Sequence, residues 1–510
     1  MLFNRRQLLK TASIGSAILA AGQSRAVLSE SPAQAGNVAR ANAYKHRIAF
    51  GAWVNDMRND PLPFQNWPAP QLDDETVNSI VQALELQSKS GYNMLDVAGL
   101  DFLAEGWDTN IGESLPPERA QRVKTIIKAA HDRGMKLQYI FGTYSWGFNK
   151  LIAKYPELAG TLPGGTGAKS KVAMCDANPE TFEWIKKILD YLLSEFDFDA
   201  VHLESADQGY CACAHCAGKE SSTEYNTRIV AKTADYIKSK WPDTFLSAIT
   251  LGWIGMNDRF SEQEQEHVIA LSKSVDCIFD QGHKQSFMIA AEDRESFIKR
   301  LHCDFGTSGG LWMYPSVRWD RESYFVPTVH RQGNALKKQF TEGVTGCMYY
   351  QGPIKNPAVE VNIACGGKVM SDTTRDTSDV LTEVLEELYQ PKSAHALKGL
   401  STVFTLAEDS YFDQWKEEAF RKNWATAMSG EFYMDRLFGE VPGPAGYMLY
   451  PQYLDKEGRL AYKKGLVAAL RELEKIRRDF HETERVDSIR RCLIVSLTIL
   501  ETILAAKGEA

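Results

Sequence analysis

Three carboxylates stand at or directly after short apolar runs of the sequence, where strand ends are expected to carry chemistry. Glu204 and Asp207 belong to or follow the run at 200–204, and Asp280 ends the run at 275–280. A carboxyl group that stays protonated near neutral pH can donate a proton to a leaving oxygen, and burial beside aromatic rings raises its pKa. We expect Glu204 to be the general acid/base, assisted by Asp207 and Asp280. The alternative for Glu204 is a helix cap or a pair with a neighbouring arginine.

Other residues near these strand ends suit a sugar. Aromatic rings stack on the C–H faces of sugars, and carboxylates bond hydroxyl groups. Glycoside hydrolysis usually needs two carboxylates, and Asp280 or Asp96 would be the second. Several of the rings could instead fill the protein core. The expected substrate-binding residues are Trp53, Asp96, Trp146, His283, Trp312 and Tyr349.

Three cysteines and a histidine stand within six residues directly after the apolar run that carries Glu204. They are Cys211, Cys213, His215 and Cys216. Such a density of soft ligands indicates a metal, and Cys175 is able to complete a four-cysteine zinc site. A disulfide and free thiols remain as alternatives. A zinc ion here would be structural, because it would hold the loop that carries Glu204.

The elements that must position these residues alternate along the chain. Eight short apolar runs are separated by amphipathic stretches such as 73–90, 117–134, 179–196 and 224–241. This alternation favours parallel strands with crossover helices and therefore a closed α/β barrel of the (β/α)8 type. An open doubly wound sheet is the rival, although no Gly-x-Gly-x-x-Gly opens the first unit. The eight runs are 46–53, 92–97, 136–142, 200–204, 245–250, 275–280, 310–314 and 346–350.

The strand pattern stops near residue 375. Helical periodicity then covers 379–389, 394–407, 413–428 and 463–506, with a loop rich in proline and glycine at 439–451. We therefore expect a barrel domain at 46–374 and an all-α domain at 375–510.

The first residues resemble an export signal. Arg5 and Arg6 precede Leu8, Leu9 and Lys10, and a weakly apolar run follows at 11–22. Paired arginines before a short apolar run match a twin-arginine signal, which predicts removal of about residues 1–36 and a periplasmic or secreted protein. An uncleaved membrane anchor is the alternative. No later apolar stretch has the roughly 18 residues of a membrane span.

The composition is that of an ordinary globular protein, with 24% charged residues and a net charge of −8. A nucleic-acid-binding domain would instead show clustered Lys and Arg, so a nucleic-acid partner is not expected. Oligomeric state is left open.

Four stretches together resemble a group of barrel hydrolases related to the α-glucuronidases and β-N-acetylhexosaminidases. They are 155–157 (Tyr-Pro-Glu), 175–180 (Cys-Asp-Ala-Asn-Pro-Glu), 202–209 with the cysteines after it, and 387–391 (Glu-Leu-Tyr-Gln-Pro). The last stretch is similar to the turn that opens the helical C-terminal domain of such proteins, with Gln390 in place of a glycine. The resemblance implies acid/base chemistry at Glu204 and Asp207. The adjacent Asp-Glu of the hexosaminidases is missing, which puts their substrate-assisted mechanism in doubt.

These observations lead to one expected function, a glycoside hydrolase acting on an oligosaccharide or polysaccharide fragment. The alternatives are a non-catalytic carbohydrate-binding barrel and a polysaccharide lyase. A metal-dependent hydrolase built on Asp280 and His283 is disfavoured, because neither His-x-His nor His-Glu-x-x-His occurs.

Overall fold

The computed structural model describes residues 42–60, 72–100, 106–205, 210–254, 259–280, 289, 291–309, 324–414 and 454–509. The expected export signal lies outside these residues, as do Asp207, His283 and Trp312. The expected helix at 413–428 lies outside them except for its first two residues, and the loop at 439–451 lies outside entirely.

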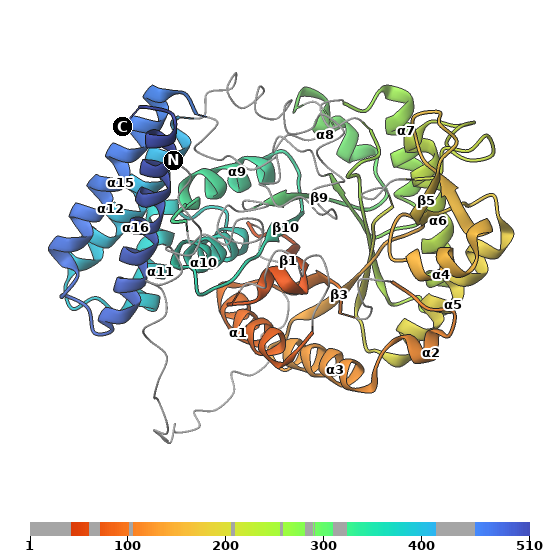
Figure 1. Ribbon diagram of the computed structural model, residues 1–510, viewed down its shortest axis with the longest axis horizontal. Helices are drawn as coiled ribbons and strands as arrows, with labels where there is room; N and C mark the ends of the chain where they lie inside the picture. Colours follow the sequence, from red (N-terminus) through yellow and green to blue (C-terminus); the bar gives the residue numbers. More distant parts are fainter. Residues whose placement is uncertain are drawn as a thin grey trace. The chain divides into compact units, whose positions relative to one another are not determined.

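Eight parallel strands close into a barrel in chain order, so the predicted (β/α)8 fold is confirmed and the open sheet is excluded (Figure 1). The barrel closes where β1 pairs with β10, through His46 with Gly346 up to Phe50 with Tyr350. The strands are β1 (His46–Trp53), β2 (Met94–Ala98), β3 (Lys136–Phe141), β6 (Ala200–Leu203), β7 (Phe245–Ile249), β8 (Cys277–Asp280), β9 (Asp304–Gly309) and β10 (Gly346–Tyr350).

A helix follows each strand, and local sequence signals set where several of them begin and end. Asp73 accepts a hydrogen bond from the Thr76 N–H at the start of α1, and Gly91 ends α1 with a φ of 96°. Side-chain caps satisfy amide groups that have no partner inside the helix. The helices around the barrel are α1 (Asp74–Ser90), α3 (Pro117–His131), α5 (Pro179–Glu195), α6 (Ser222–Lys240), α7 (Glu262–Leu271), α8 (Ala291–Arg300), α9 (Val329–Thr341) and α10 (Pro357–Ser371).

One strand differs from the prediction. The seventh barrel strand is β9 at Asp304–Gly309 and not 310–314, which lies outside the described residues. Gly306 and Gly309 weaken the strand signal in the sequence. The packing inside the barrel explains why residue 306 is a glycine. A Cβ atom on Gly306 would lie 2.3 Å from the Phe279 ring. Phe279 therefore fills space that a side chain on β9 would otherwise occupy.

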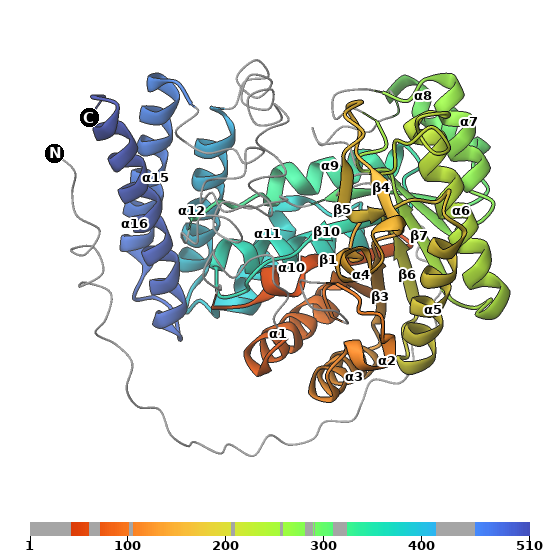
Figure 2. The same cartoon turned by 45° about the vertical axis from the view of Figure 1, so that its right-hand side comes forward.

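An insertion between β3 and α5 was not predicted. It contains α4 (Asn149–Lys154), a 3-10 turn (Pro156–Leu158) and an antiparallel hairpin of β4 (Ala159–Thr161) and β5 (Lys169–Met174). Figure 2 shows the hairpin beside α4, with which β5 is in contact. Because the insertion follows the carboxyl end of β3, it belongs to the same rim as the expected site.

The chain after the barrel is helical, as predicted. It forms α11 (Thr377–Tyr389), α12 (Ala394–Phe412), α15 (Lys456–Ile476) and α16 (Thr483–Ala506). The periodic stretch 463–506 is therefore two helices, separated by a turn whose Phe480 pairs with Pro391. Helix α15 packs against both α12 and α16 (Figure 1).

Partly buried polar contacts join these helices to the barrel. Arg485 of α16 donates to both carboxylate oxygens of Glu360 in α10, at 2.8 Å each. Glu408 of α12 accepts from the backbone N–H groups of His330 and Arg331 at the start of α9. The boundary at residue 375 stays a prediction. Among the described residues, no helix is both long enough and apolar enough to cross a membrane.

Candidate active site at the barrel mouth

Glu204 stands at the carboxyl end of β6, where (β/α)8 enzymes carry their active sites. Its backbone N–H donates to the Phe141 carbonyl at 3.0 Å, which continues the pairing of β6 with β3 by one residue. The residue is half-buried. Side chains alternate along a strand, so Glu204 shares the inward face of His202, which lies two residues deeper.

Asp96 does not lie free at the mouth but forms a pair with His202 inside the barrel. His202 Nδ1 lies 2.8 Å from Asp96 Oδ2, and both side chains are fully buried. Gln138 donates from Nε2 to the same carboxylate oxygen at 3.0 Å and to Ser247 Oγ at 3.1 Å. Burial raises the pKa of Asp96, and the interaction with His202 opposes that rise. The network spans four neighbouring strands.

The second imidazole nitrogen of His202 does not take part in this network. Within the described part of the chain, His202 Nε2 and Asp96 Oδ1 are buried and have no hydrogen-bond partner. The Phe50 ring stacks on the imidazole at a centroid distance of 6.3 Å. A histidine held by a carboxylate through Nδ1 presents Nε2 as an atom that can accept or donate a proton.

Asp280 ends β8 and is 2% exposed. Thr250 donates from its hydroxyl to Asp280 Oδ1 at 3.1 Å. The neighbouring Phe279 faces the barrel interior, so strand alternation directs the Cβ of Asp280 to the other side of the barrel wall. The structure therefore separates Asp280 from the inward face shared by Glu204 and His202.

Two of the expected sugar-binding rings lie together. The Trp53 and Trp146 rings are 5.5 Å apart and inclined by 47°. Tyr144 adopts a φ of 63°, a left-handed conformation that few non-glycine residues tolerate, in the turn that leads to Trp146. The Trp146 ring covers Gly142, where a Cβ atom would lie 2.3 Å from it. Trp53 is the last residue of β1 and Trp146 follows β3, so both rings belong to strand ends at the mouth.

Tyr349 lies elsewhere. Its side chain is 2% exposed and packs outside the strand wall, against Gly366 of α10 and 6.3 Å from the Tyr92 ring. The alternative that some aromatic residues fill the core therefore describes Tyr349. The structure does not bring it together with Trp53 and Trp146.

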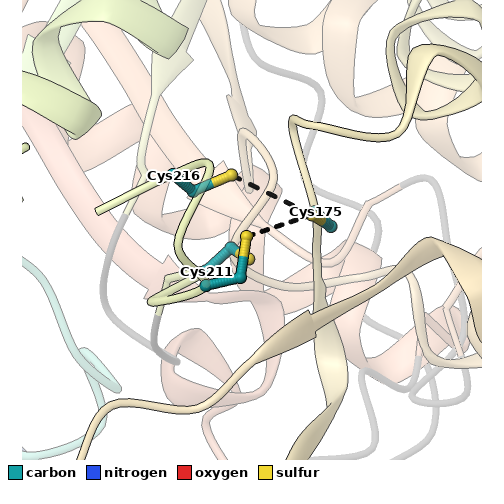
Figure 3. A group of neighbouring side chains, drawn as sticks. Cys175, Cys211 and Cys216 are labelled. Carbon is teal, nitrogen blue, oxygen red and sulfur yellow. Dashed lines mark hydrogen bonds between the residues drawn. The ribbon is translucent and has the colours of Figure 1, made fainter. Parts of the chain in front are cut away.

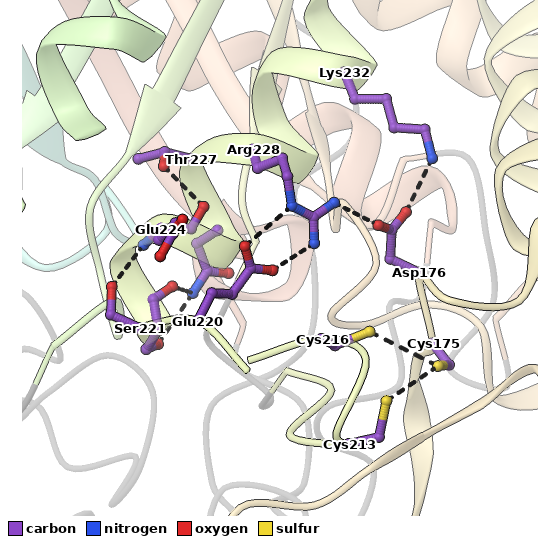
Figure 4. Close-up of polar contacts among 12 residues, drawn as sticks. Cys175, Asp176, Cys213, Cys216, Glu220, Ser221, Glu224, Thr227, Arg228 and Lys232 are labelled. Carbon is purple, nitrogen blue, oxygen red and sulfur yellow. Dashed lines mark hydrogen bonds and ion pairs between the residues drawn. The ribbon is translucent and has the colours of Figure 1, made fainter. Parts of the chain in front are cut away.

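The four expected metal ligands, named here the thiol cluster, do come together. Their sulfur atoms all lie within 4.8 Å of one another, so the cluster could bind a metal ion. Cys175 Sγ is 3.8 Å from Cys213 Sγ and 3.9 Å from Cys216 Sγ. Figure 3 shows the sulfur atom of Cys216 directed toward Cys175, and Figure 4 shows the same for Cys213. Hydrogen bonds from the thiols of Cys211 and Cys216 lower the pKa of Cys175 to about 3.

Charged residues from α6 support one side of the thiol cluster. Arg228 donates to Asp176 at 2.6 Å and to Glu220 at 2.6 Å, and Lys232 donates to Asp176 at 3.0 Å. In Figure 4 the guanidinium group lies between the two carboxylates, and Asp176 directly follows Cys175. Burial raises the pKa of Asp176, but the two cations outweigh it and hold the pKa below its usual range.

Sequence reasoning missed His202, Gln138 and Ser247 as members of the site. A histidine within an apolar strand is a usable signal for His202, because an imidazole buried in a core needs a partner. Gln138 and Ser247 carry no such signal. Only the pairing of β2, β3, β6 and β7 brings them to Asp96 and His202.

Comparisons with known proteins support the fold. No protein-family model and no curated protein matches the chain. The chain is similar to a GH138 enzyme targeting pectin rhamnogalacturonan II, with 9% identity, a TM-score of 0.54, and coverage of 91% of this chain and 57% of that one.

Two other solved structures are less similar. One is an O-GlcNAc hydrolase from Thermobaculum terrenum, with 13% identity, a TM-score of 0.44, and coverage of 91% of this chain and 97% of that one. The other is a chitobiase from Flavobacterium johnsoniae, with 12% identity, a TM-score of 0.44, and coverage of 92% of this chain and 73% of that one. At these identities the likeness concerns the fold alone.

Proposed function

We propose that this protein is a glycoside hydrolase that acts on an oligosaccharide or a polysaccharide fragment, with Glu204 as its general acid/base. The observation that carries the proposal is the position of Glu204. It follows the fourth barrel strand, is half-buried, and shares the inward face of a buried Asp96–His202 pair. Barrel enzymes build their catalytic sites from residues at such strand ends.

The proposed chemistry needs a carboxyl group that donates a proton to the leaving oxygen and later recovers it. Glu204 performs this role, and Asp207, three residues further on, is proposed to assist it. Asp280 is left out of the proposed site, because strand alternation directs its Cβ away from the inward face of Glu204. The neighbouring rings of Trp53 and Trp146 support a sugar platform at the mouth.

Trp312 and His283 lie outside the described residues and stay predictions. Tyr349 is left out of the platform because its ring packs against α10. A carbohydrate is the proposed partner.

A panel of chromogenic glycosides, including uronides and N-acetylhexosaminides, tests the proposal on the purified protein. Turnover of one member that is lost in Glu204→Gln is expected. The matched control is Glu157→Gln, which changes an exposed glutamate of the insertion and should keep full activity. Turnover unchanged in Glu204→Gln would contradict the assignment.

The same panel separates the other readings. Binding of a sugar without turnover of any member would favour a non-catalytic binding barrel. A product that absorbs in the ultraviolet would identify a lyase, because elimination leaves an unsaturated sugar.

We also propose that the protein reaches the periplasm, or is secreted, by the twin-arginine route. The support is Arg5-Arg6 before a short apolar run. Replacing both arginines by lysine should leave the precursor in the cytoplasm, which fractionation measures. Secretion unchanged in this variant would contradict the proposal.

A metal in the thiol cluster is proposed to be zinc and structural. Four protein thiols complete the tetrahedral coordination of zinc and leave no position for water or substrate, unlike a catalytic zinc site with three protein ligands. Glu204 is therefore proposed to act without direct help from this ion.

A further inference from the structure

We propose that the thiol cluster binds one Zn²⁺ ion, and that this ion fastens the chain after β6 to the β4–β5 hairpin at the rim of the barrel. The proposal goes beyond the sugar chemistry, because it assigns a cross-link between two segments of the rim. Its first part, metal content, is measured without any substrate.

The distances between the sulfur atoms suit a tetrahedral ion. A Zn–S bond of about 2.3 Å places neighbouring sulfur atoms of a regular tetrahedron about 3.8 Å apart. Cys175 Sγ lies 3.8 Å from Cys213 Sγ and 3.9 Å from Cys216 Sγ. A disulfide would need about 2.05 Å between two of these atoms. The arrangement therefore favours a shared ion over a disulfide.

The backbone around the cysteines is folded as a compact turn. The Cys216 N–H and the Gly218 N–H both donate to the Cys213 carbonyl at 3.0 Å, and the Ala217 N–H donates to the Cys211 carbonyl at 3.1 Å. The Thr161 N–H donates to Cys211 Sγ at 3.3 Å. A hydrogen bond to sulfur stabilises the negative charge of a thiolate, which is the form that binds metal.

The ligands come from two segments that are distant in sequence. Cys175 directly follows β5, and the other three cysteines follow β6. The Ala212 N–H also donates to the Thr161 carbonyl of β4 at 2.7 Å, so the two segments already touch at the hairpin. One ion bound to all four thiols would stabilise this contact and hold the segment 211–216 against the hairpin.

A third element supports one side of the cross-link. Arg228 and Lys232 of α6 both pair with Asp176, the residue after Cys175, and Arg228 also pairs with Glu220. Because groups around metal ligands orient them, this network is suited to keep Cys175 in place.

Metal analysis of the full-length protein, purified without chelator, is the first test. We expect one zinc per chain, and a large loss of zinc in Cys175→Ser and Cys213→Ser. The matched control is Cys303→Ser, a half-buried thiol outside the cluster, which should keep its zinc. Iron in place of zinc, or no metal, would overturn the proposal.

Thiol counting tests the disulfide alternative and does not depend on whether variants fold. Alkylation in denaturant with chelator and without reductant should modify all nine cysteines of the chain. Seven or five modified cysteines would reveal a disulfide and contradict the zinc site.

Exchange with Co²⁺ tests the coordination and the cross-link on the wild-type protein. Tetrahedral thiolate ligands should give the intense visible and near-ultraviolet absorption of a cobalt–thiolate centre. Removal of the metal should raise hydrogen exchange at 159–175 and 211–218 and leave β9 and β10 protected. Uniform exchange across the barrel, or none at the two segments, would overturn the role as a cross-link.

Discussion

The aspartates where the barrel strands begin and the aspartate inside the barrel have different partners. At the end where strands begin, Asp199, Asp276 and Asp304 each stand at or next to the first residue of a strand. Asp199 accepts from His131 and from the Leu137 N–H, both at 2.8 Å. Asp276 accepts from Lys238 at 2.8 Å and from the Leu246 N–H at 2.7 Å. Asp199 and Asp276 each bind a backbone N–H group of a neighbouring strand and the side chain of a histidine or a lysine.

Asp304 has side-chain partners of the same kind, since Lys45 and His46 lie 2.6 and 2.8 Å from its Oδ2. Asp96, inside the barrel, has different partners, a buried imidazole and an amide.

This difference separates carboxylates that stabilise the fold from one that could take part in chemistry. Carboxylates at the starting end have partners that satisfy them in the folded state. Near the mouth, burial without a permanently charged partner raises the pKa of Asp96. Such perturbation is typical of functional sites. This distinction can be tested by changing one residue in each region and measuring both activity and stability.

The largest expected effect concerns Glu204 and Asp276. We expect Glu204→Gln to lower kcat by about 10²–10⁴-fold, the usual contribution of a general acid/base, with little change in Tm. Asp276→Asn should keep kcat and lower the free energy of unfolding by about 1 kcal/mol, because it weakens the bonds to Lys238 and the Leu246 N–H. Kinetics on a responsive glycoside and thermal unfolding measure both. A similar loss of kcat in both variants would contradict the different roles of Glu204 and Asp276.

The next effect compares two histidine–aspartate pairs with the same 2.8 Å separation. His202→Ala leaves Asp96 buried without its imidazole, and breaking such a pair costs about 3–5 kcal/mol of unfolding free energy. His131→Ala breaks the half-exposed pair with Asp199, which should cost about 1 kcal/mol or less. Urea unfolding measures both values. Equal costs would show that burial does not distinguish the pairs.

A smaller effect is expected for two glycines. Gly142→Ala places a Cβ atom 2.3 Å from the Trp146 ring, and such overpacking costs about 1–3 kcal/mol. The displaced ring should also raise KM for the glycoside. The control is Gly134→Ala at the starting end, which meets nothing within 4 Å and is strained only by its φ of 69°. A KM that rises equally in both variants would argue against Trp146 as a platform.

The smallest effect is a dependence on pH. Burial raises the pKa of Asp304, but hydrogen bonds from His46 and Lys45 outweigh it and hold the pKa below the usual 3.8. The carboxylate therefore stabilises the folded state above pH 3.8, and this contribution is lost as pH falls through the lowered pKa. Asp304→Asn should reduce the loss of stability on acidification, measured by urea unfolding at pH 6 and pH 3. An unchanged pH profile would contradict this assignment.

The sequence alone predicted the repeating strands and helices, because apolar runs and amphipathic stretches follow different periods and caps mark helix ends. It missed β9, whose Gly306 makes room for Phe279, and the hairpin of β4 and β5, whose strands carry little apolar signal. It also merged α15 and α16, because one helical period runs across both.

The residues of the site divide in the same way. Cysteine spacing predicted the thiol cluster, since three of its four members are local in sequence. By contrast, the contact between Asp96 and His202 spans 106 residues, the packing of Tyr349 against α10 depends on which face of β10 it occupies, and the direction of Asp280 depends on Phe279. Local patterns determined which elements form, whereas barrel closure and strand register decided which side chains meet, because those contacts join strands that are distant in the chain.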